Sequence, residues 1–423
     1  MTPPGAQEPS GGGRRRGALA QPGGPMRTSG DRELAEQLAD AMLGARGDAD
    51  RWTHGFHVYP ARMHPEIAAR LCRRFVAKDK VVLDPFCGSG TVLVEASAAG
   101  ARSIGVDLNP LALRLAALKC TRTDDDLRAR LLATCREVVE RTLAGVRARA
   151  DVRAPLSATV RRSWDGHVLR ELAVLHREIG LVEAPFVREA LLLVFSAIVV
   201  KFSRQRADTS ADEVQRNIGK GVPTRFFARK TEELVRRLAE LAAALPADAT
   251  APRLVLGDAR ELAVGDASVD VVITSPPYVG TYDYVLHHAL RWPWLGIDPS
   301  PLVKGEIGAR RDATTQGGAV RWERDLSRVL AGVARTLKPD GLVLWVAGDG
   351  EIGGRRIPAD DQLRTLAPKH GLELVAIASQ RRVDWHGGAA REEHLAALRA
   401  NAPINQRGLA RLRSPHPARP GRR

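Results

Sequence analysis

The chain has 423 residues, of which 64 are Lys or Arg and 49 are Asp or Glu, so its formal net charge is +15 and its pI is near 10.3. A composition that is 44% hydrophobic and 27% charged excludes disorder along the whole chain and provides for one large core or two ordinary ones. The four cysteines share no metal-type spacing and are too few for a disulfide framework, so we expect no metal and a reducing, cytoplasmic setting. The longest apolar run, residues 190–200, is shorter than the about 20 residues that a spanning helix needs, and residues 11–16 are only Gly and Arg. We therefore expect neither a membrane segment nor an export signal.

Two thirds of the positive excess lies at the two ends of the chain. Residues 1–30 carry a net charge of +3 and residues 394–423 carry +7, which leaves +5 for residues 31–393. Both ends are rich in Gly, Pro and Arg and poor in large apolar residues. We therefore expect residues 1–30 and 401–423 to be disordered basic tails, which either solubilise the protein or contact phosphates without sequence preference.

The folded part begins with a helical pattern at residues 31–46 and continues with strands that alternate with helices. Two apolar runs, residues 81–84 and 103–107, end in Asp and lead into helical patterns, which is typical of a parallel sheet. Further strands are predicted at residues 254–256, 269–273, 342–346, 372–379 and 394–398. The pattern predicts an α/β fold with helices on both faces of the sheet.

A helical insertion divides this domain. Residues 121–250 have apolar side chains at spacings of three and four, with four predicted helices at residues 127–146, 169–179, 187–200 and 230–245. The α/β domain is thus expected in two parts, residues 31–120 and residues 251–400, and the insertion is a candidate for nucleic-acid recognition.

A Gly-rich turn, Asp-Pro-Phe-Cys-Gly-Ser-Gly-Thr at residues 84–91, lies between the first strand and the next helix. Gly88 and Gly90 allow a close approach of a ligand, and the helix N-terminus offers N–H groups. A P-loop is excluded because no Lys follows Gly90, and a dinucleotide fingerprint is weakened because position 93 is Leu. The remaining ligand of this type is S-adenosylmethionine, whose amino-acid end the turn would hold.

Acidic residues at the ends of the next two strands support this interpretation. Asp107 lies 17 residues after Gly90 and is placed to accept hydrogen bonds from ribose hydroxyls. Asp258 follows a later strand and could accept from an adenine amino group. Three acidic strand ends together predict a nucleoside cofactor more strongly than the glycines alone.

The segment Ser275-Pro276-Pro277-Tyr278 follows a predicted strand. Proline fixes φ and lacks an N–H, so this stiff turn presents carbonyl oxygens and few donors. Such a turn suits an exocyclic amino group, and we expect the Ser275 oxygen and the Pro276 carbonyl to accept its two hydrogens while Tyr278 stacks on the base. The base must leave the duplex to reach this turn.

Aromatic residues gather at the same motifs. The chain has only four Tyr, and three of them are Tyr278, Tyr282 and Tyr284. The fourth, Tyr59, lies with Phe56 in Phe-His-Val-Tyr-Pro-Ala-Arg-Met at residues 56–63, upstream of the Gly-rich turn. Base stacking on aromatic rings accounts for this clustering, although packing under a loop would also do so.

With these motifs the chain resembles the S-adenosylmethionine-dependent methyltransferases that modify amino groups of DNA, at cytosine N4 or adenine N6. The similar segments are residues 56–63, 84–91 and 275–278. The resemblance implies a Rossmann-like class I methyltransferase sheet, duplex DNA as the partner, and Ser275, Pro276, Pro277 and Tyr278 as catalytic residues. The implied cofactor contacts are Phe56, Tyr59, Asp84, Pro85, Phe86, Gly88, Gly90, Thr91, Asp107, Asn109, Asp258 and Ala259. Because position 275 is Ser where many adenine enzymes have Asp, the resemblance favours cytosine N4.

Other segments are candidates for nucleic-acid contact. Residues 201–230 form the densest basic stretch of the folded part, with Ser203, Arg204 and Arg225 as expected contacts beside Tyr282 and Tyr284; a solvated helix face is the competing interpretation. Residues 296–320 are Gly-rich and would form either a lid or an ordinary surface loop. The alternatives to a DNA cytosine-N4 methyltransferase are an adenine-N6 enzyme, an RNA or tRNA guanine-amino methyltransferase, and a catalytically silent nucleic-acid-binding protein.

Overall fold

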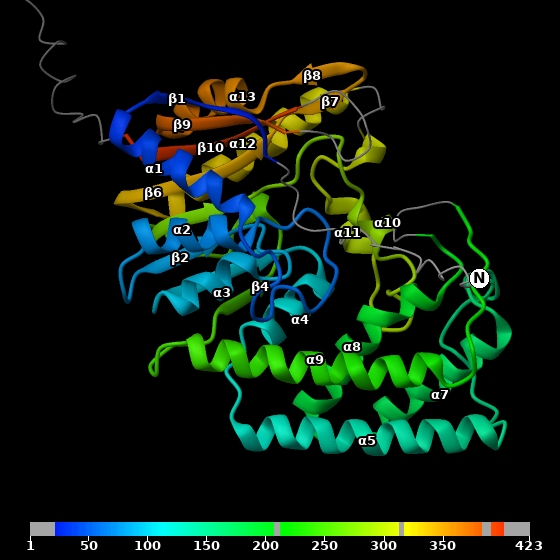
Figure 1. Ribbon diagram of the computed structural model, residues 1–423. Helices are drawn as coiled ribbons and strands as arrows, with labels where there is room; N and C mark the ends of the chain where they lie inside the picture. Colours follow the sequence, from blue (N-terminus) through cyan, green and yellow to red (C-terminus); the bar gives the residue numbers. More distant parts are fainter. Residues whose placement is uncertain (1–21, 207–211, 313–316, 383–390, 402–423) are drawn as a thin grey trace, which may run out of the picture.

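The structure is a computed structural model that describes residues 22–206, 212–312, 317–382 and 391–401. Within these residues one sheet of eight strands crosses the molecule in the order β1-β9-β10-β6-β5-β2-β3-β4 (Figure 1). The strands from β4 to β6 pair in parallel, whereas β10, β9 and β1 extend the sheet in antiparallel pairs. Their bounds are β1 (Pro22–Gly30), β2 (Val81–Asp84), β3 (Arg102–Asp107), β4 (Arg253–Leu256), β5 (Val269–Thr274), β6 (Leu337–Gly348), β9 (Leu372–Arg382) and β10 (Arg391–Ala400).

The strand order reverses at β2. From β2 the chain proceeds outward to β3 and, after the helical insertion, to β4; it then returns to β5 on the other side of β2. Ligands of open α/β sheets bind outside the carboxyl ends of the strands at such a reversal. This sheet, covered on both faces, has the predicted Rossmann-like class I methyltransferase architecture, and every strand predicted from the sequence lies within an observed one.

Helices cover both faces of the sheet because the strands present apolar side chains in alternation. Val271 and Ile273 of β5 pack on one side with the first three helices of the chain, whereas Val272 packs on the other side with the last two helices. The first group is α1 (Arg32–Leu43), α2 (Pro65–Phe75) and α3 (Thr91–Ala98), and the second is α12 (Gly318–Thr336) and α13 (Ala359–Leu366). Short elements complete this part: α10 (Tyr284–His287), α11 (Ser300–Gly305), β7 (Gly350–Ile352) and β8 (Arg355–Ile357).

The helical insertion has a core of its own, in which Leu131, Leu172 and Val194 are buried. Its helices are α5 (Asp125–Arg147), α6 (Ala158–Arg161), α7 (Gly166–Gly180), α8 (Pro185–Val199) and α9 (Val222–Ala244), and the two long ones, α5 and α9, lie side by side below the sheet (Figure 1). Helix α4 (Pro110–Lys119) joins the insertion to the sheet: it packs against β3, β4 and α8, and Arg114 pairs with Glu189 of α8 at 2.6 Å. No helix in the described part of the chain combines the length and apolarity needed to cross a membrane.

The prediction of a disordered tail over residues 1–30 is wrong for its last nine residues. Pro22–Gly30 form β1, which pairs antiparallel with β9 and places Met26 against the core beneath α1. The segment has poor strand propensity, but the edge of β9 offers unpaired backbone groups, and pairing satisfies them. Residues 1–21 and 402–423, the rest of the predicted tails, lie outside the described residues.

Candidate functional site

The Gly-rich turn connects β2 to α3 and is shaped by its two glycines. Gly88 and Gly90 have φ of 49° and 89°, a region that favours glycine. A Cβ on Gly88 would lie 3.1 Å from the Tyr59 ring, and one on Gly90 would lie 3.0 Å from the Cα of Ala116 in α4. Gly88 therefore keeps the turn open toward Tyr59, whereas Gly90, which does not line the pocket described next, lets α4 pack closely against the start of α3.

A pocket opens beside this turn at the point where the strand order reverses. Its wall comes from segments that are far apart in the sequence, namely residues 59–63, 84–92, 107–109, 257–259, 275–284 and 302–307. The predicted cofactor residues Tyr59, Asp84, Pro85, Phe86, Gly88, Thr91, Asp107, Asn109, Asp258 and Ala259 all line it.

Two carboxylates of this wall, Asp84 and Asp107, are held by the turn. Asp84 accepts from the Phe86 N–H at 3.0 Å and from the Thr274 hydroxyl at 2.8 Å, which ties the end of β2 to the end of β5. Asp107 accepts from the N–H groups of Gly88 at 2.9 Å and Asn109 at 2.8 Å. Burial raises the pKa of Asp84 to about 7 and that of Asp107 to about 6. A cationic ligand beside these two acids would therefore stabilise their ionised forms.

These hydrogen bonds change one expectation from the sequence. The Gly88 N–H donates to Asp107 and the Gly90 N–H donates to the Cys87 carbonyl at 2.8 Å, so neither is available to a ligand. These two N–H groups, which we expected to face the cofactor, instead stabilise the conformation of the turn.

Asp258 lines the pocket and is paired with the nearby Arg260, whose Nε and Nη2 make three contacts with its carboxylate at 2.6 to 3.1 Å. Burial alone would raise the pKa of Asp258, but Arg260 holds it below its usual value. Asp258 also caps the short helical turn in which Ala259 lies. Its carboxylate therefore remains charged and fixed in direction.

The segment before the turn contributes Tyr59 and Arg62 to the wall. The Tyr59 hydroxyl accepts from the Asn109 amide at 3.3 Å, and its ring lies 5.3 Å from His288 and 6.1 Å from Tyr284. Phe56 is different: it is fully buried in the core of the insertion and does not line the pocket. The prediction of Phe56 as a cofactor contact is therefore wrong, because its ring fills the junction between the sheet and the insertion.

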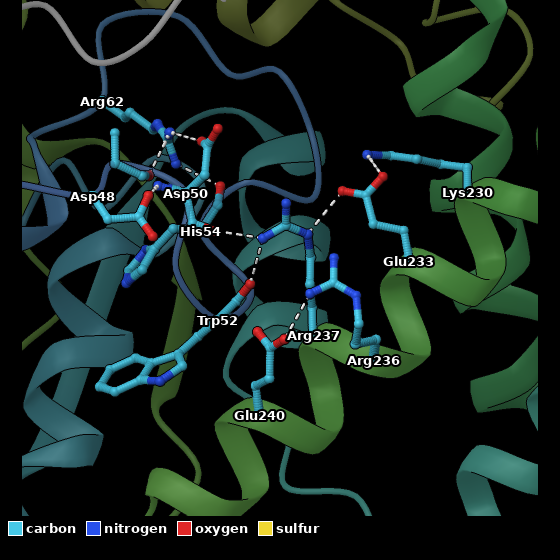
Figure 2. A network of polar contacts seen from close by, with 11 residues as sticks. Asp48, Asp50, Trp52, His54, Arg62, Lys230, Glu233, Arg236, Arg237 and Glu240 are labelled. Atoms are coloured by element: carbon cyan, nitrogen blue, oxygen red, sulfur yellow. Dashed lines mark hydrogen bonds and ion pairs between the residues drawn. The ribbon is translucent and has the colours of Figure 1, made fainter.

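A polar network holds Arg62 in place and links it to α9 (Figure 2). Arg62 donates to the His54 carbonyl at 2.5 Å, to the Ala49 carbonyl at 2.8 Å and to Asp50 at 3.0 Å. From α9, Arg237 donates to the Asp50 carbonyl and, at 2.9 Å, to the Trp52 carbonyl. The insertion thus braces the loop that carries Arg62, a wall residue that the sequence did not single out.

The Ser-Pro-Pro-Tyr segment follows β5 and meets the pocket with Ser275 and Pro277. Pro276 is buried and Tyr278 lies outside the wall. The Tyr278 hydroxyl donates to Glu393 of β10 at 2.9 Å, and a Cβ on Gly348 would lie 2.5 Å from its ring. The ring is therefore fixed between β6 and β10 at the active edge of the sheet.

The other two Tyr residues of this region lie together. Tyr282 is 6.1 Å from Tyr284, and Tyr284 lines the pocket and stands 6.1 Å from Tyr59. The loop predicted as a candidate lid places Leu302, Gly305, Glu306 and Ile307 in the wall, and Glu306 accepts from the Tyr284 N–H at 2.6 Å. The sequence did not predict a contact between this loop and the aromatic cluster, because its pattern of charges and glycines does not indicate which part of the protein the loop packs against.

The predicted nucleic-acid contacts in the insertion do not reach this pocket. Ser203 is 1% exposed and donates to the Val200 carbonyl at 2.7 Å, so it cannot touch a phosphate in this conformation. Arg204 pairs with Asp165 at 2.7 Å, and Arg225 is exposed on α9. Ser203 is thus corrected to a structural residue, and Arg204 and Arg225 lie away from the site.

Among the described residues, one cluster has the spacing of a metal site: Asp349, Glu392 and His394. Arg356 forms an ion pair with Asp349, and His394 contacts Asp349 at 3.2 Å and Ser379 at 2.8 Å. The Arg356 guanidinium thus takes the position that a metal ion would have beside Asp349, and we interpret the cluster as an ion-pair network at the edge of the sheet.

The charges of the wall decide which nucleoside cofactor fits the pocket. The wall carries four acids, Asp84, Asp107, Asp258 and Glu306, against one base, Arg62, so it disfavours the phosphates of a nucleotide. S-adenosylmethionine has a sulfonium and an ammonium group, two ribose hydroxyls and no phosphate. The residues present therefore fit S-adenosylmethionine.

Comparison with known proteins gives matches in the same region. Residues 43–118 match the family model of a DNA methylase that covers N6 and N4 methyltransferases. The Type II methyltransferase M.MvaI of Kocuria varians is 42% identical over 72 residues, which are 16% of this chain and 16% of the relative. M.MjaII of Methanocaldococcus jannaschii is 34% identical over 92 residues, 22% of this chain and 17% of the relative. The matched stretch thus spans about a sixth of the length of these relatives.

A crystal structure of a methyltransferase from Methanosarcina mazei covers 82% of this chain and 99% of its own at 12% identity, but its TM-score of 0.32 is too low to support an inference. The match to the family model includes the Gly-rich turn and Asp107. The stretch of residues 43–118, which carries this turn and both buried carboxylates, is thus the part of the chain that is similar to the DNA methylase family model.

Proposed function

We propose that the protein is a DNA methyltransferase that transfers a methyl group from S-adenosylmethionine to the exocyclic amino group of a flipped base, with cytosine N4 as the favoured target. The observation that carries this proposal is the contact between two motifs: Ser275 and Pro277 share one wall with Asp84, Asp107 and the Gly-rich turn. The cofactor and the amino group would therefore meet in one pocket, in the cytoplasm, where the DNA lies.

The cofactor would be held by the side chains already fixed in the wall. Asp107 keeps lone pairs for ribose hydroxyls, Asp84 faces positive charge, and the Gly88 cradle beside Tyr59 admits the amino-acid end. When bound, S-adenosylmethionine supplies an electrophilic methyl group on sulfur. The attraction between these acids and a cationic ligand would favour binding, and it is stronger in a buried site than in bulk water.

The catalytic turn would act by accepting hydrogen bonds. An amino nitrogen conjugated with a base ring is a weak nucleophile, and acceptors on both hydrogens localise its lone pair. Ser275 lines the pocket and the adjacent proline backbone is stiff, so we propose the Ser275 oxygen and the Pro276 carbonyl as these acceptors. No protein nucleophile is needed, which agrees with buried Cys87, whose thiol pKa is raised well above its usual value by burial.

The base platform is proposed to be Tyr278, assisted by the cluster of Tyr282 and Tyr284. Burial and the adjacent Glu393 carboxylate raise the pKa of Tyr278, so its hydroxyl stays protonated and keeps its bond to Glu393. The ring is thus held at the end of the catalytic turn. We further propose that the insertion of residues 121–250 contributes to recognition of the DNA.

Identification of the methylated base tests the proposal. The protein is incubated with tritiated S-adenosylmethionine and duplex DNA, tRNA or no acceptor, and the digested acceptor is analysed for its modified base. N4-methylcytosine in DNA is expected; N6-methyladenine would change the base, methylated tRNA guanine would change the acceptor, and no transfer to any acceptor would favour a silent binding protein.

The Pro276→Ala variant tests the role of the turn. We expect it to lower turnover by one to two orders of magnitude with cofactor affinity nearly unchanged, because a stiff acceptor acts mainly in the transition state; a loss of about 2 kcal/mol corresponds to this range. Wild-type turnover in this variant would show that the catalytic role of the turn is wrong.

A further inference from the structure

Lys119, the last residue of α4, is a buried amine beside the Gly-rich turn. Its side chain is 1% exposed, and its Nζ donates to the Ser89 hydroxyl at 2.9 Å. A buried charge is costly unless a charge of opposite sign accompanies it. The feature to be explained is why a lysine occupies this position.

The charged groups that face Lys119 from the neighbouring elements are mostly cationic. Burial lowers the pKa of Lys119 well below its usual value, and Arg62, Arg237 and Lys230 lower it further. Arg62 comes from the segment before α2, and the other two come from α9. Among the described residues, no ion pair joins Lys119 to a carboxylate.

The nearby carboxylates are already paired with other cations. Glu95 pairs with Arg51 at 2.6 Å and contacts His54 at 2.7 Å. In the same way, Asp50 pairs with Arg62, and Glu233 pairs with both Lys230 and Arg237. A charge on Lys119 would therefore need an anion from outside the chain to balance it.

The partner of Lys119 leads directly to the cofactor pocket. Ser89 lies between Gly88 and Gly90; it is 2% exposed but, unlike Ser203, belongs to the lining of the pocket. Because the Ser89 oxygen accepts from Lys119, its own hydrogen is free to donate elsewhere. The N–H groups of Gly88 and Gly90 are used within the protein, so this hydroxyl is the donor that the middle of the turn has to offer an anion.

We infer that Ser89, oriented and polarised by Lys119, binds the carboxylate at the amino-acid end of S-adenosylmethionine. Ser89 is the binding residue and Lys119 is a positioning residue that acts through it. The inference rests on the proposed function, and it divides the cofactor among separate side chains: Asp84 for its positive groups, Asp107 for its ribose hydroxyls, and Ser89 with Lys119 for its carboxylate.

Calorimetric binding of two cofactors tests the inference without use of turnover. S-adenosylmethionine is compared with its decarboxylated form, which keeps the sulfonium, the amine and the adenosine but lacks the carboxylate. Wild type, Lys119→Met and Ser89→Ala are measured, with Lys78→Met as a control that removes the same charge at an exposed site. Met fits a buried aliphatic environment, and circular dichroism checks that each variant is folded.

Wild type is expected to bind S-adenosylmethionine ~10–100-fold more tightly than the decarboxylated form, the range typical of hydrogen bonds to charged groups. Lys119→Met and Ser89→Ala should each remove most of this preference. Both variants should bind the decarboxylated form with an affinity within ~2-fold of wild type. The control Lys78→Met should keep the preference. An equal loss for both cofactors, or no loss for either, would overturn the inference.

Failure of the inference is distinguishable from failure of the proposed function. If wild type binds S-adenosylmethionine and methylates DNA but Lys119→Met keeps the preference, only the role of Lys119 and Ser89 is refuted. If wild type binds neither cofactor, the proposed function itself is refuted, and the inference with it.

Discussion

The substitution Asp84→Asn tests how the charge of Asp84 affects two quantities, the stability of the fold and the affinity for a cationic ligand. Asp84 is buried, and a single carboxylate oxygen accepts from both Phe86 and Thr274. An asparagine oxygen can accept the same two hydrogen bonds. The substitution therefore removes the ionisable group at nearly constant shape.

The magnitude follows from the pKa. Burial raises the pKa of Asp84 from 3.8 to about 7, so the folded protein keeps a proton that the unfolded chain has lost. The stability of wild type therefore falls as the pH rises from about 4 to 7 and stays lower above 7. At about 1.4 kcal/mol per pKa unit, the full effect is roughly 4 kcal/mol, of which about 2–3 kcal/mol develops between pH 5 and pH 8.

Urea unfolding of the ligand-free protein at pH 5 and pH 8 measures this effect. The free energy of unfolding of Asp84→Asn relative to wild type should increase by about 2–3 kcal/mol between the two pH values. Asp340→Asn, which changes an exposed carboxylate, serves as the matched control and should show no such increase. A difference between Asp84→Asn and wild type that is constant with pH would refute the raised pKa.

The same variant should bind S-adenosylmethionine more weakly than wild type at pH 8, because the ionised carboxylate favours a cationic ligand. Wild-type affinity should rise between pH 5.5 and pH 8 as Asp84 and Asp107, whose pKa values are raised by burial to about 7 and about 6, lose their protons. Isothermal titration at several pH values measures both effects. An affinity independent of pH would contradict this electrostatic role.

Three further predictions concern the catalytic edge, the turn and the tails. Tyr278→Phe removes the hydrogen bond to Glu393, worth about 1 kcal/mol, and should lower turnover ~5-fold with the cofactor Kd unchanged; an unaltered single-turnover rate would show that this bond does not hold the ring. Gly90→Ala combines φ of 89° with a contact at 3.0 Å to Ala116, and should lower the free energy of unfolding by about 2 kcal/mol in urea titrations; a wild-type value would contradict the strain. Deletion of residues 1–21 and 402–423 should flatten the salt dependence of DNA binding, measured by fluorescence anisotropy, without abolishing methyl transfer; an unchanged slope would exclude phosphate contact by the tails.

The α/β pattern was predictable because each strand of the first half ends in an acid before a helical pattern begins. Asp84, Asp107 and Asp258 marked the carboxyl edge of the sheet, and all three line the pocket. Ser275 was predictable in the same way, as a polar residue after a buried strand. Local sequence was sufficient here because the carboxyl ends of parallel strands share one edge.

The residues that sequence analysis missed depend on contacts between distant segments. Lys119 has the sequence pattern of an ordinary basic residue at a helix end, and its burial depends on distant segments, since Thr53, Ser89 and side chains of α9 surround it. Arg62 is held by carbonyl groups, which leave no trace in a sequence. Phe56 was misassigned for the converse reason, since an aromatic residue near a motif can equally belong to a core.

Strand β1 shows how tertiary structure overrides local propensity. Pro22–Gly30 contain three glycines and two prolines, a composition that predicts disorder. The strand forms because β9 would otherwise expose an unpaired edge at the end of the sheet. No pattern within the nine residues indicates that partner.

The most direct test of the central claim is a single-turnover experiment that follows the methyl group. Protein loaded with tritiated S-adenosylmethionine is mixed with excess duplex DNA, and the label is located in the digested nucleosides for wild type and for Pro276→Ala. Label on the exocyclic nitrogen of cytosine, appearing much more slowly with Pro276→Ala than with wild type, is the predicted result. Retention of all label in the cofactor by wild type, or its appearance on a ring carbon, would contradict amino methylation at the Ser-Pro-Pro-Tyr turn.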